Sequence, residues 1–452
     1  MELLALSATQ MARLIRERRI SSVELVEAHL RRIAEVNPAI NAAIEVFGES
    51  ALAEARAADA ARPRGVLHGV PFSVKDSIEV AGRVCTAGTL GRKNAAPAAE
   101  DATLVARLRA AGAIPIARTN LPDLLFAFES DNLLFGATKN PHDLTRTAGG
   151  SSGGEAALIA AGGSPMGLGS DAAGSVRLPA AFCGIASIKP TSGRLPRTGH
   201  VPPAGGWIEA LWQIGPMARR IEDLVTMMPL LAGTDGRDHT CVGMPVRDPG
   251  EVDVRRLRVA FHTDNGIAAA GPEVSQVVRA AAAELDAVED RPACLDQAYE
   301  LEMKFLGPDG GDGLWRYLEA IGSTSVHPLL AGWLEKLRPY RTDVAGFAGY
   351  WAELDRYRAE MLAFLRRYDA IVCPVYPEAA LLLGTSTVEE NFRGFSHTMA
   401  YNLTGWPAAV ARCGTSGAGL PVAVQVVAAP WREDIALAVA GYLEEQSAPP
   451  AR

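Results

Sequence analysis

The stretch TAGGSSGGEAAL, residues 147–158, places two adjacent serines between two pairs of glycines and then runs into an apolar helical pattern. A glycine-rich loop before a helix can cradle a phosphate, and a serine at a sharp turn before a helix can be a nucleophile. A third interpretation is that the loop carries a group that assists a nucleophile elsewhere. The surrounding sequence decides among the three.

Nucleotide binding is disfavoured by the residues around the glycines. A Walker-type loop needs Lys and then Ser or Thr after its last glycine, whereas Gly154 is followed by Glu155, which would repel phosphate. The segment GLGSDA (167–172) matches GxGxxA, but it lacks a preceding strand-like run and an acidic residue about 20 positions later. We therefore reject this interpretation.

A nucleophile elbow is the second interpretation. Residues 149–153 satisfy GxSxG with Ser151 as nucleophile, and Asp369 and His397 follow in the order that α/β-hydrolases use. An elbow needs a strand before it, however, and the polar residues 140–148 (NPHDLTRTA) make a poor strand. An α/β-hydrolase-like esterase that uses Ser151 stays open as an alternative.

The third interpretation uses residues on both sides of the loop. Lys75 ends an apolar strand-like segment, and Ser175 lies in AAGS (172–175), whose consecutive N–H groups can converge on an oxyanion. A serine must lose its proton to attack an amide, and a lysine accepts that proton only if burial lowers its pKa from about 10.4 to roughly 7–8. Ser151 could relay the proton between them.

The segment from Gly149 to Pro196 resembles the defining segment of the amidase signature family of serine hydrolases. The resemblance covers nearly the whole chain, and within the family it is nearest to the fatty-acid-amide and aryl-amide hydrolases. The other matching stretches are SSVELVEAHLRRIAEVNPAINA (21–42), LHGVPFSVKDSIEVAG (67–82), ARTNLPDL (117–124), GATKNPHDLTR (136–146), NLTGWPAAVARCG (402–414) and GLPVAVQVVA (419–428).

The resemblance implies a Ser–Ser–Lys triad. Ser175 corresponds to the nucleophile, Ser151, 24 residues earlier, to the relay, and Lys75 to the base. It also implies a cis peptide bond between Gly150 and Ser151, and a mechanism that requires no metal or organic cofactor. The implied oxyanion hole consists of the backbone N–H groups of Ala172, Ala173, Gly174 and Ser175.

Two positions depart from the family pattern, and three neighbours are candidates for supporting roles. Relatives usually have Gly at the position of Ala173, and often Thr at that of Ser170. A positive φ at Ala173 would cost on the order of 1 kcal/mol. Asp171 and Arg177 are expected to pair with each other rather than with substrate. Ser152 is expected to stand beside the relay or to support the turn.

The pattern of elements predicts an α/β fold: a single large amidase-signature-type domain (1–452) with a central mixed β-sheet flanked by helices. Its core is expected at about 1–245 and 366–452, with a variable helical middle segment at about 250–365 on the substrate side. Aromatic residues of that segment could wall a substrate pocket or simply pack in the core. Hydrophobic candidates for the pocket elsewhere are Phe126, Phe128, Trp207, Trp212 and Phe395.

The composition of the chain limits its expected partners and its expected cellular location. A net charge of −8 with a pI near 5.6 argues against a nucleic-acid partner. Six scattered cysteines without a CxxC pair, the lack of a signal-like N-terminus and the lack of an apolar run of about 18 residues predict a cytoplasmic protein without a membrane span. The family resemblance also admits a homodimer.

We therefore expect a hydrolase that cleaves the C–N bond of linear aryl or fatty acyl amides, with esters and carbamates (urethanes) as further small-molecule substrates. The alternatives are the Ser151 esterase described above and a partner-dependent glutamine amidotransferase A-type subunit.

Overall fold

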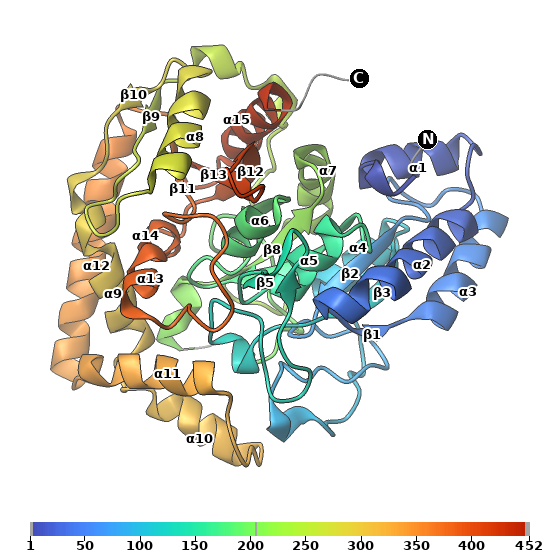
Figure 1. The fold of residues 1–452 in the computed structure, drawn as a ribbon, viewed down its shortest axis with the longest axis horizontal. Coiled ribbons are helices and arrows are strands. Elements are labelled where there is room, and N and C mark those ends of the chain that lie inside the picture. Colours follow the sequence, from blue (N-terminus) through green and yellow to red (C-terminus); the bar gives the residue numbers. More distant parts are fainter. Residues whose placement is uncertain (1–2, 204–205, 448–452) are drawn as a thin grey trace.

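A central mixed sheet organises the computed structural model, which describes residues 3–203 and 206–447 (Figure 1). Among these residues the sheet has eleven strands, and a separate two-stranded sheet pairs β4 (Lys139–Asn140) with β5 (Asp143–Thr147). In spatial order the strands are β1 (Ala43–Val46), β3 (Ile114–Thr119), β2 (Pro71–Lys75), β6 (Met166–Asp171), β8 (Gln213–Ala218), β7 (Ala186–Lys189), β12 (Ala408–Thr415), β13 (Pro421–Ala428), β11 (Ala370–Pro374), β9 (Val259–Phe261) and β10 (Val288–Glu289).

Helices cover the sheet, and three hydrophobic clusters hold the layers together. The first joins α1, α4, α7, α8 and α15 to the sheet, the second joins α2, α3, α5 and α6 to it, and the third is built largely from α9 to α14. The helices are α1 (Ala8–Arg16), α2 (Ser22–Ile40), α3 (Gly48–Ala60), α4 (Thr103–Ala110), α5 (Gly153–Ala160), α6 (Arg177–Cys183), α7 (Ile221–Leu231), α8 (Pro272–Ala283), α9 (Ala298–Leu306), α10 (Asp312–Ala320), α11 (Pro328–Leu337), α12 (Val344–Leu365), α13 (Glu389–Gly394), α14 (Ser396–Leu403) and α15 (Glu433–Gln446).

The two N-terminal helices, α1 and α2, each begin at a serine cap. The side chains of Ser7 and Ser21 each accept a hydrogen bond from the backbone N–H of the third residue of the helix that follows. The side chain of that third residue accepts a hydrogen bond from the backbone N–H of the serine. Such a capping box satisfies backbone N–H groups that have no partner within the helix. The α/β fold class expected from the sequence, a central mixed sheet flanked by helices, is confirmed.

Two segments differ from expectation. The middle segment is mainly helical, but it also supplies β9 and β10, which extend the sheet beyond β11 through parallel pairing. The polar residues before Ser151, expected to be a poor strand, do form the strand β5. That strand pairs with β4 outside the central sheet, because its alternating polar side chains suit a surface ribbon rather than a buried layer.

The order of the strands places the site. Strands β2 and β6 are parallel neighbours, so the ends that carry Lys75 and Asp171 lie at the same edge of the sheet. Helix α5 begins directly after Ser152, and α6 begins two residues after Ser175. Both glycine-rich loops therefore reach the edge at which Lys75 ends its strand.

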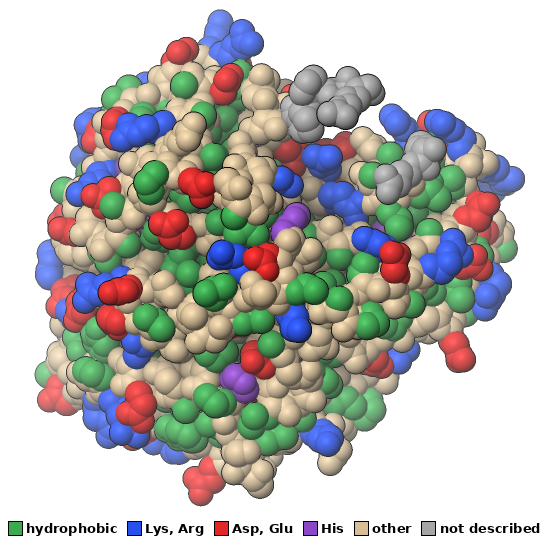
Figure 2. Space-filling model, viewed as in Figure 1, with side chains coloured by type: hydrophobic (Ala, Val, Ile, Leu, Met, Phe, Trp, Pro, Cys, Tyr) green, Lys and Arg blue, Asp and Glu red, His purple; other side chains and the backbone are tan. Residues whose placement is uncertain are grey.

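The molecular surface carries both signs of charge, and Figure 2 shows Lys and Arg side chains interspersed with Asp and Glu over the face in view. None of the helices in the described residues has a stretch long and apolar enough to cross a bilayer.

Candidate active site

Lys75 lies at the centre of a group of hydroxyls. Its side chain is fully buried, and its Nζ lies 2.7 Å from Oγ of Ser151, 2.9 Å from Oγ of Ser152 and 3.2 Å from Oγ of Ser170. No carboxylate is among these neighbours. The amine is therefore surrounded by groups that can exchange protons with it but do not hold it as a cation in an ion pair.

Burial sets the protonation state of this lysine. Removal from water lowers the pKa of Lys75 well below its usual value, and the charges of Asp171 and Glu155 oppose that shift. Glu155 is itself buried, which raises its pKa to about 7, and it accepts hydrogen bonds from the hydroxyls of Ser73 and Thr119. A lysine with a lowered pKa can act as a general base near neutral pH.

The pH dependence of activity follows from this lowered pKa. Only the neutral amine accepts a proton, so we expect kcat/KM to be constant above the pKa of Lys75 and to fall about tenfold per pH unit below it. Because the charge of Glu155 raises the pKa of Lys75, Glu155→Gln should move this acid limb to lower pH. A pH–rate profile of both proteins measures the shift, and an acid limb that moved to higher pH in the variant would contradict the assignment to Lys75.

The loop with the paired serines is tightly packed. The Gly150–Ser151 peptide bond is cis, as the family resemblance implied. A Cβ on Gly150 would lie 2.6 Å from the backbone nitrogen of Glu129, and one on Gly154 would lie 2.4 Å from that of Asn120. Side chains do not approach backbone that closely, so glycine is required at both positions.

The loop that carries Ser175 is shaped by Asp171. Its carboxylate accepts hydrogen bonds from the N–H of Gly174 at 2.8 Å and of Val176 at 3.1 Å. Positive φ falls on Gly174 and not on Ala173, so the strain expected at Ala173 does not arise. The expected set of four oxyanion donors also needs correction, because the N–H of Gly174 points to Asp171.

Asp171 and Arg177 form a buried ion pair, with two contacts of 3.0 Å between guanidinium and carboxylate. Asn402 donates to the same carboxylate at 2.9 Å, and Arg177 also donates to Gln425 at 3.1 Å. The guanidinium holds the pKa of Asp171 well below its usual range, against the effect of burial. The two residues pair with each other, as expected, and fix the base of the Ser175 loop.

A largely apolar cavity of about 360 Å³ opens beside the serines, and both Ser151 and Ser175 line it. Four of the five aromatic pocket candidates line it as well: Phe126, Phe128, Trp207 and Trp212. Phe395 does not, because it lies behind the wall, stacked on Phe128 with ring centroids 3.7 Å apart.

The middle segment supplies the other wall of the cavity. Tyr317 and Trp333 line it, together with Leu306, Leu314 and Leu337. From the sequence, the aromatic residues of this segment could either wall the substrate pocket or pack in the core. No sequence pattern indicated which of them would face the cavity. Helices α10 and α11, drawn at the lower left of Figure 1, carry most of these side chains.

The residues of a nucleophile elbow are not brought together. Nε2 of His397 lies 2.8 Å from the carbonyl oxygen of Ala268, and the imidazole is buried. Asp369 pairs instead with Arg258. Ser151 has Lys75 as its basic neighbour, so the elbow interpretation is wrong.

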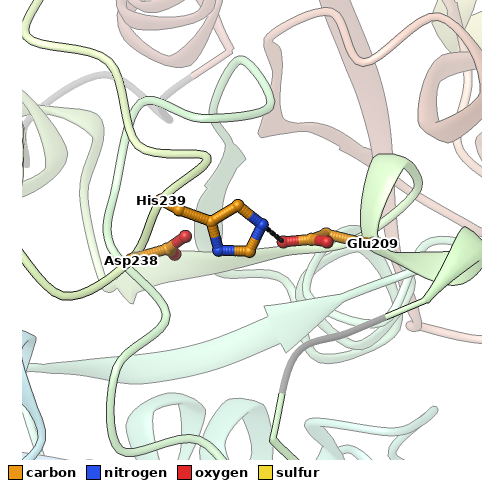
Figure 3. A group of neighbouring side chains, drawn as sticks. All are labelled: Glu209, Asp238 and His239. Atoms are coloured by element: carbon orange, nitrogen blue, oxygen red, sulfur yellow. Dashed lines mark ion pairs between the residues drawn. The ribbon is translucent and has the colours of Figure 1, made fainter.

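Within the described part of the chain, one group of potential metal ligands brings Glu209, Asp238 and His239 together outside the cavity (Figure 3). Arg197 pairs with Glu209 at 2.6 Å and with Asp238 at 3.2 Å. Because both carboxylates are already paired with Arg197, part of their negative charge is compensated and the group offers less to a cation.

The Amidase family model matches residues 24–296 and 319–437, which is most of the chain. The chain therefore belongs to the amidase family, as a hydrolase that acts on amide C–N bonds.

Individual relatives of several activities align along nearly the whole chain. The A-type subunit of a glutamyl-tRNA(Gln) amidotransferase from Roseiflexus sp. (strain RS-1) is 34% identical, covering 93% of this chain and 92% of its own. A fatty-acid amide hydrolase 2-A from Danio rerio is 31% identical, covering 98% of this chain and 89% of its own. The solved structure of a 6-aminohexanoate cyclic dimer hydrolase superposes with a TM-score of 0.88 at 29% identity, covering 99% of this chain and 98% of its own.

Proposed function

We propose that this amidase is a stand-alone hydrolase of amides with an apolar acyl or aryl part, with Ser175 as nucleophile, Ser151 as proton relay and Lys75 as base. The observation that carries the proposal is the 2.7 Å contact between the buried Nζ of Lys75 and Oγ of Ser151, at the end of an apolar cavity that Ser175 also lines. A serine attacks an amide only if its proton is removed, and a neutral amine can accept that proton through an intervening hydroxyl.

The reaction proceeds in two steps of acyl transfer. Oγ of Ser175 bonds to the carbonyl carbon while its proton passes through Ser151 to Lys75, and the C–N bond then breaks as that proton returns to the departing amine. Water repeats the sequence on the acyl-enzyme and releases the acid. The N–H groups of Ala172, Ala173 and Ser175 are the donors left to stabilise the oxyanion once Gly174 is excluded.

Esters and carbamates fit the same chemistry, because each presents a carbonyl carbon with a leaving group. A carbamate would acylate Ser175 as a carbonate or carbamoyl species and release an amine or an alcohol. The test is product release from a panel of an anilide, a fatty amide, an aryl ester and an aryl carbamate, with the intact mass of the acylated protein measured at early times. Failure to release product from every member would overturn the proposal.

The wall of the cavity should determine the affinity for apolar substrates. Phe126→Ala removes a ring that lines the cavity and packs edge-on against Trp333 at 6.2 Å. Burial of such a ring contributes about 1.5–3 kcal/mol, so kcat/KM for an aryl amide should fall about 10- to 100-fold, mainly through KM. Tyr368→Phe, at a residue that bonds to Asp290 and does not line the cavity, is the control. Equal losses in the two variants would contradict the pocket assignment.

A second candidate is the partner-dependent amidotransferase A-type subunit, which the 34% identity to the Roseiflexus protein supports. That activity requires glutamine hydrolysis and partner chains. The apolar lining of the cavity favours an apolar substrate over glutamine. Glutaminase activity of the purified chain, together with co-purifying partner chains, would favour the second candidate.

A further inference from the structure

We propose that His200, acting through Ser170, orients the hydrogen bonds around Lys75 so that the lone pair of its amine faces Ser151. This makes His200 a positioning residue that the sequence did not single out. The inference rests on the proposed function, in which Lys75 is the base. It concerns the direction of hydrogen bonds within the site and involves no added group.

The imidazole of His200 bridges two fixed oxygens. Its Nδ1 lies 3.0 Å from the carbonyl oxygen of Pro202, and its Nε2 lies 3.1 Å from Oγ of Ser170. The ring packs against Trp212, with centroids 4.4 Å apart, and both residues line the cavity. The histidine is therefore held in place at the side of Ser170.

The partners of the ring decide where its proton lies. A carbonyl oxygen only accepts hydrogen bonds, so Nδ1 must carry the proton. Burial lowers the pKa of His200 to about 3, so the ring is neutral at ordinary pH and Nε2 has no proton. Ser170 must then donate its hydroxyl proton to Nε2, which leaves its oxygen as an acceptor toward Lys75.

Ser152 is constrained in the same way by the backbone. Its hydroxyl donates to the carbonyl oxygen of Ser170 at 3.2 Å, and its oxygen accepts from the N–H of that residue at 3.3 Å. The proton of Ser152 is thus committed to the backbone. Toward Lys75, 2.9 Å away, its oxygen can only accept.

The remaining geometry of the amine follows from counting donors. Neutral Lys75 has two N–H groups and one lone pair, and three hydroxyl oxygens lie within 3.2 Å of its Nζ, with the carbonyl oxygen of Ser170 farther away at 3.5 Å. Ser152 and Ser170 take the two N–H groups, so the lone pair is left for Ser151. The lone pair can therefore accept the proton that Ser151 gives up in the proposed mechanism.

Without His200, the proton of Ser170 is no longer committed. Ser170 could then donate to Lys75 and occupy the lone pair, in competition with Ser151. In a fraction of the molecules, the lone pair of Lys75 would then face Ser170 instead of Ser151. Removal of the Ser170 hydroxyl would abolish that competition, whatever stands at position 200.

A double-mutant cycle tests this coupling. The readout is the second-order rate of labelling of Ser175 by a fluorophosphonate, followed by intact mass, with kcat/KM for 4-nitroacetanilide alongside. We expect His200→Ala to slow labelling about tenfold in the wild-type background and less than about twofold in the Ser170→Ala background. His200→Gln, whose side-chain oxygen can accept the proton of Ser170, should recover most of the rate.

An equal effect of His200→Ala in both backgrounds would overturn the inference, because a purely structural loss does not depend on the Ser170 hydroxyl. So would a wild-type labelling rate in His200→Ala itself. Lys75→Met separates this result from failure of the proposed function. If Lys75→Met labels as fast as wild type, Lys75 is not the base, and the proposed function fails first.

Discussion

Ser175→Ala is expected to abolish hydrolysis of 4-nitroacetanilide and of an aryl carbamate, with kcat lowered by about 10⁴-fold or more, because the variant lacks the hydroxyl that forms the acyl-enzyme in the proposed mechanism. Lys75→Met should lower it by about 10²- to 10⁴-fold, since methionine fills the volume of the buried stem but accepts no proton. Both rates are measured by release of the aromatic product.

His397→Gln is the matched control for these variants. It changes a buried titratable residue whose Nε2 bonds to the backbone carbonyl of Ala268, and the proposed mechanism does not use it. Its activity should stay within a fewfold of wild type. An active Ser175→Ala protein, or an inactive His397→Gln protein that still folds, would contradict the Ser–Ser–Lys mechanism.

Arg177→Met is expected to have the largest effect on stability. Methionine approximates the length of the arginine stem but leaves the carboxylate of Asp171 buried without its cation. Loss of one partner of a buried ion pair costs about 3–5 kcal/mol, and we expect the free energy of unfolding in urea to fall by that amount. Activity should fall as well, because Asp171 holds the Ser175 loop through the N–H of Gly174.

The ion pair of Arg258 with Asp369 is a control of the same chemistry at the surface. The arginine side chain there is 60% exposed, and exposed pairs contribute about 0–1 kcal/mol. Arg258→Met should therefore change the free energy of unfolding by less than about 1 kcal/mol. Similar losses from the two variants would show that the buried pair is not the source of the effect.

The sequence predicted the parts of this molecule that depend on local patterns. Lys75 ends a strand, as the apolar alternation of the preceding residues predicted. The motif around Ser151 and Ser175 identified the family, and its glycines at positions 150 and 154 are required where backbone approaches closely.

What could not be predicted depends on packing between distant segments. Phe128 and Phe395 are both buried aromatics, and only their stacking order decides which one meets the cavity. Tyr317 and Trp333 stand in helices whose docking no local pattern encodes. The direction of the Gly174 N–H depends on how Asp171 turns beneath the loop, and the pairing of β9 with β11 joins residues about a hundred positions apart.

The far wall of the cavity is built by a part of the chain that packs apart from the strand carrying Lys75. Residues 297–318 lie in the gap of the family match, yet Leu306, Leu314 and Tyr317 from this stretch face the substrate space. They belong to a different hydrophobic cluster from the one that contains Val74, the neighbour of Lys75 in β2. Changes in this stretch are therefore expected to leave the strand that carries Lys75 undisturbed. Grafting it between relatives is a direct route to changing which molecules the enzyme accepts.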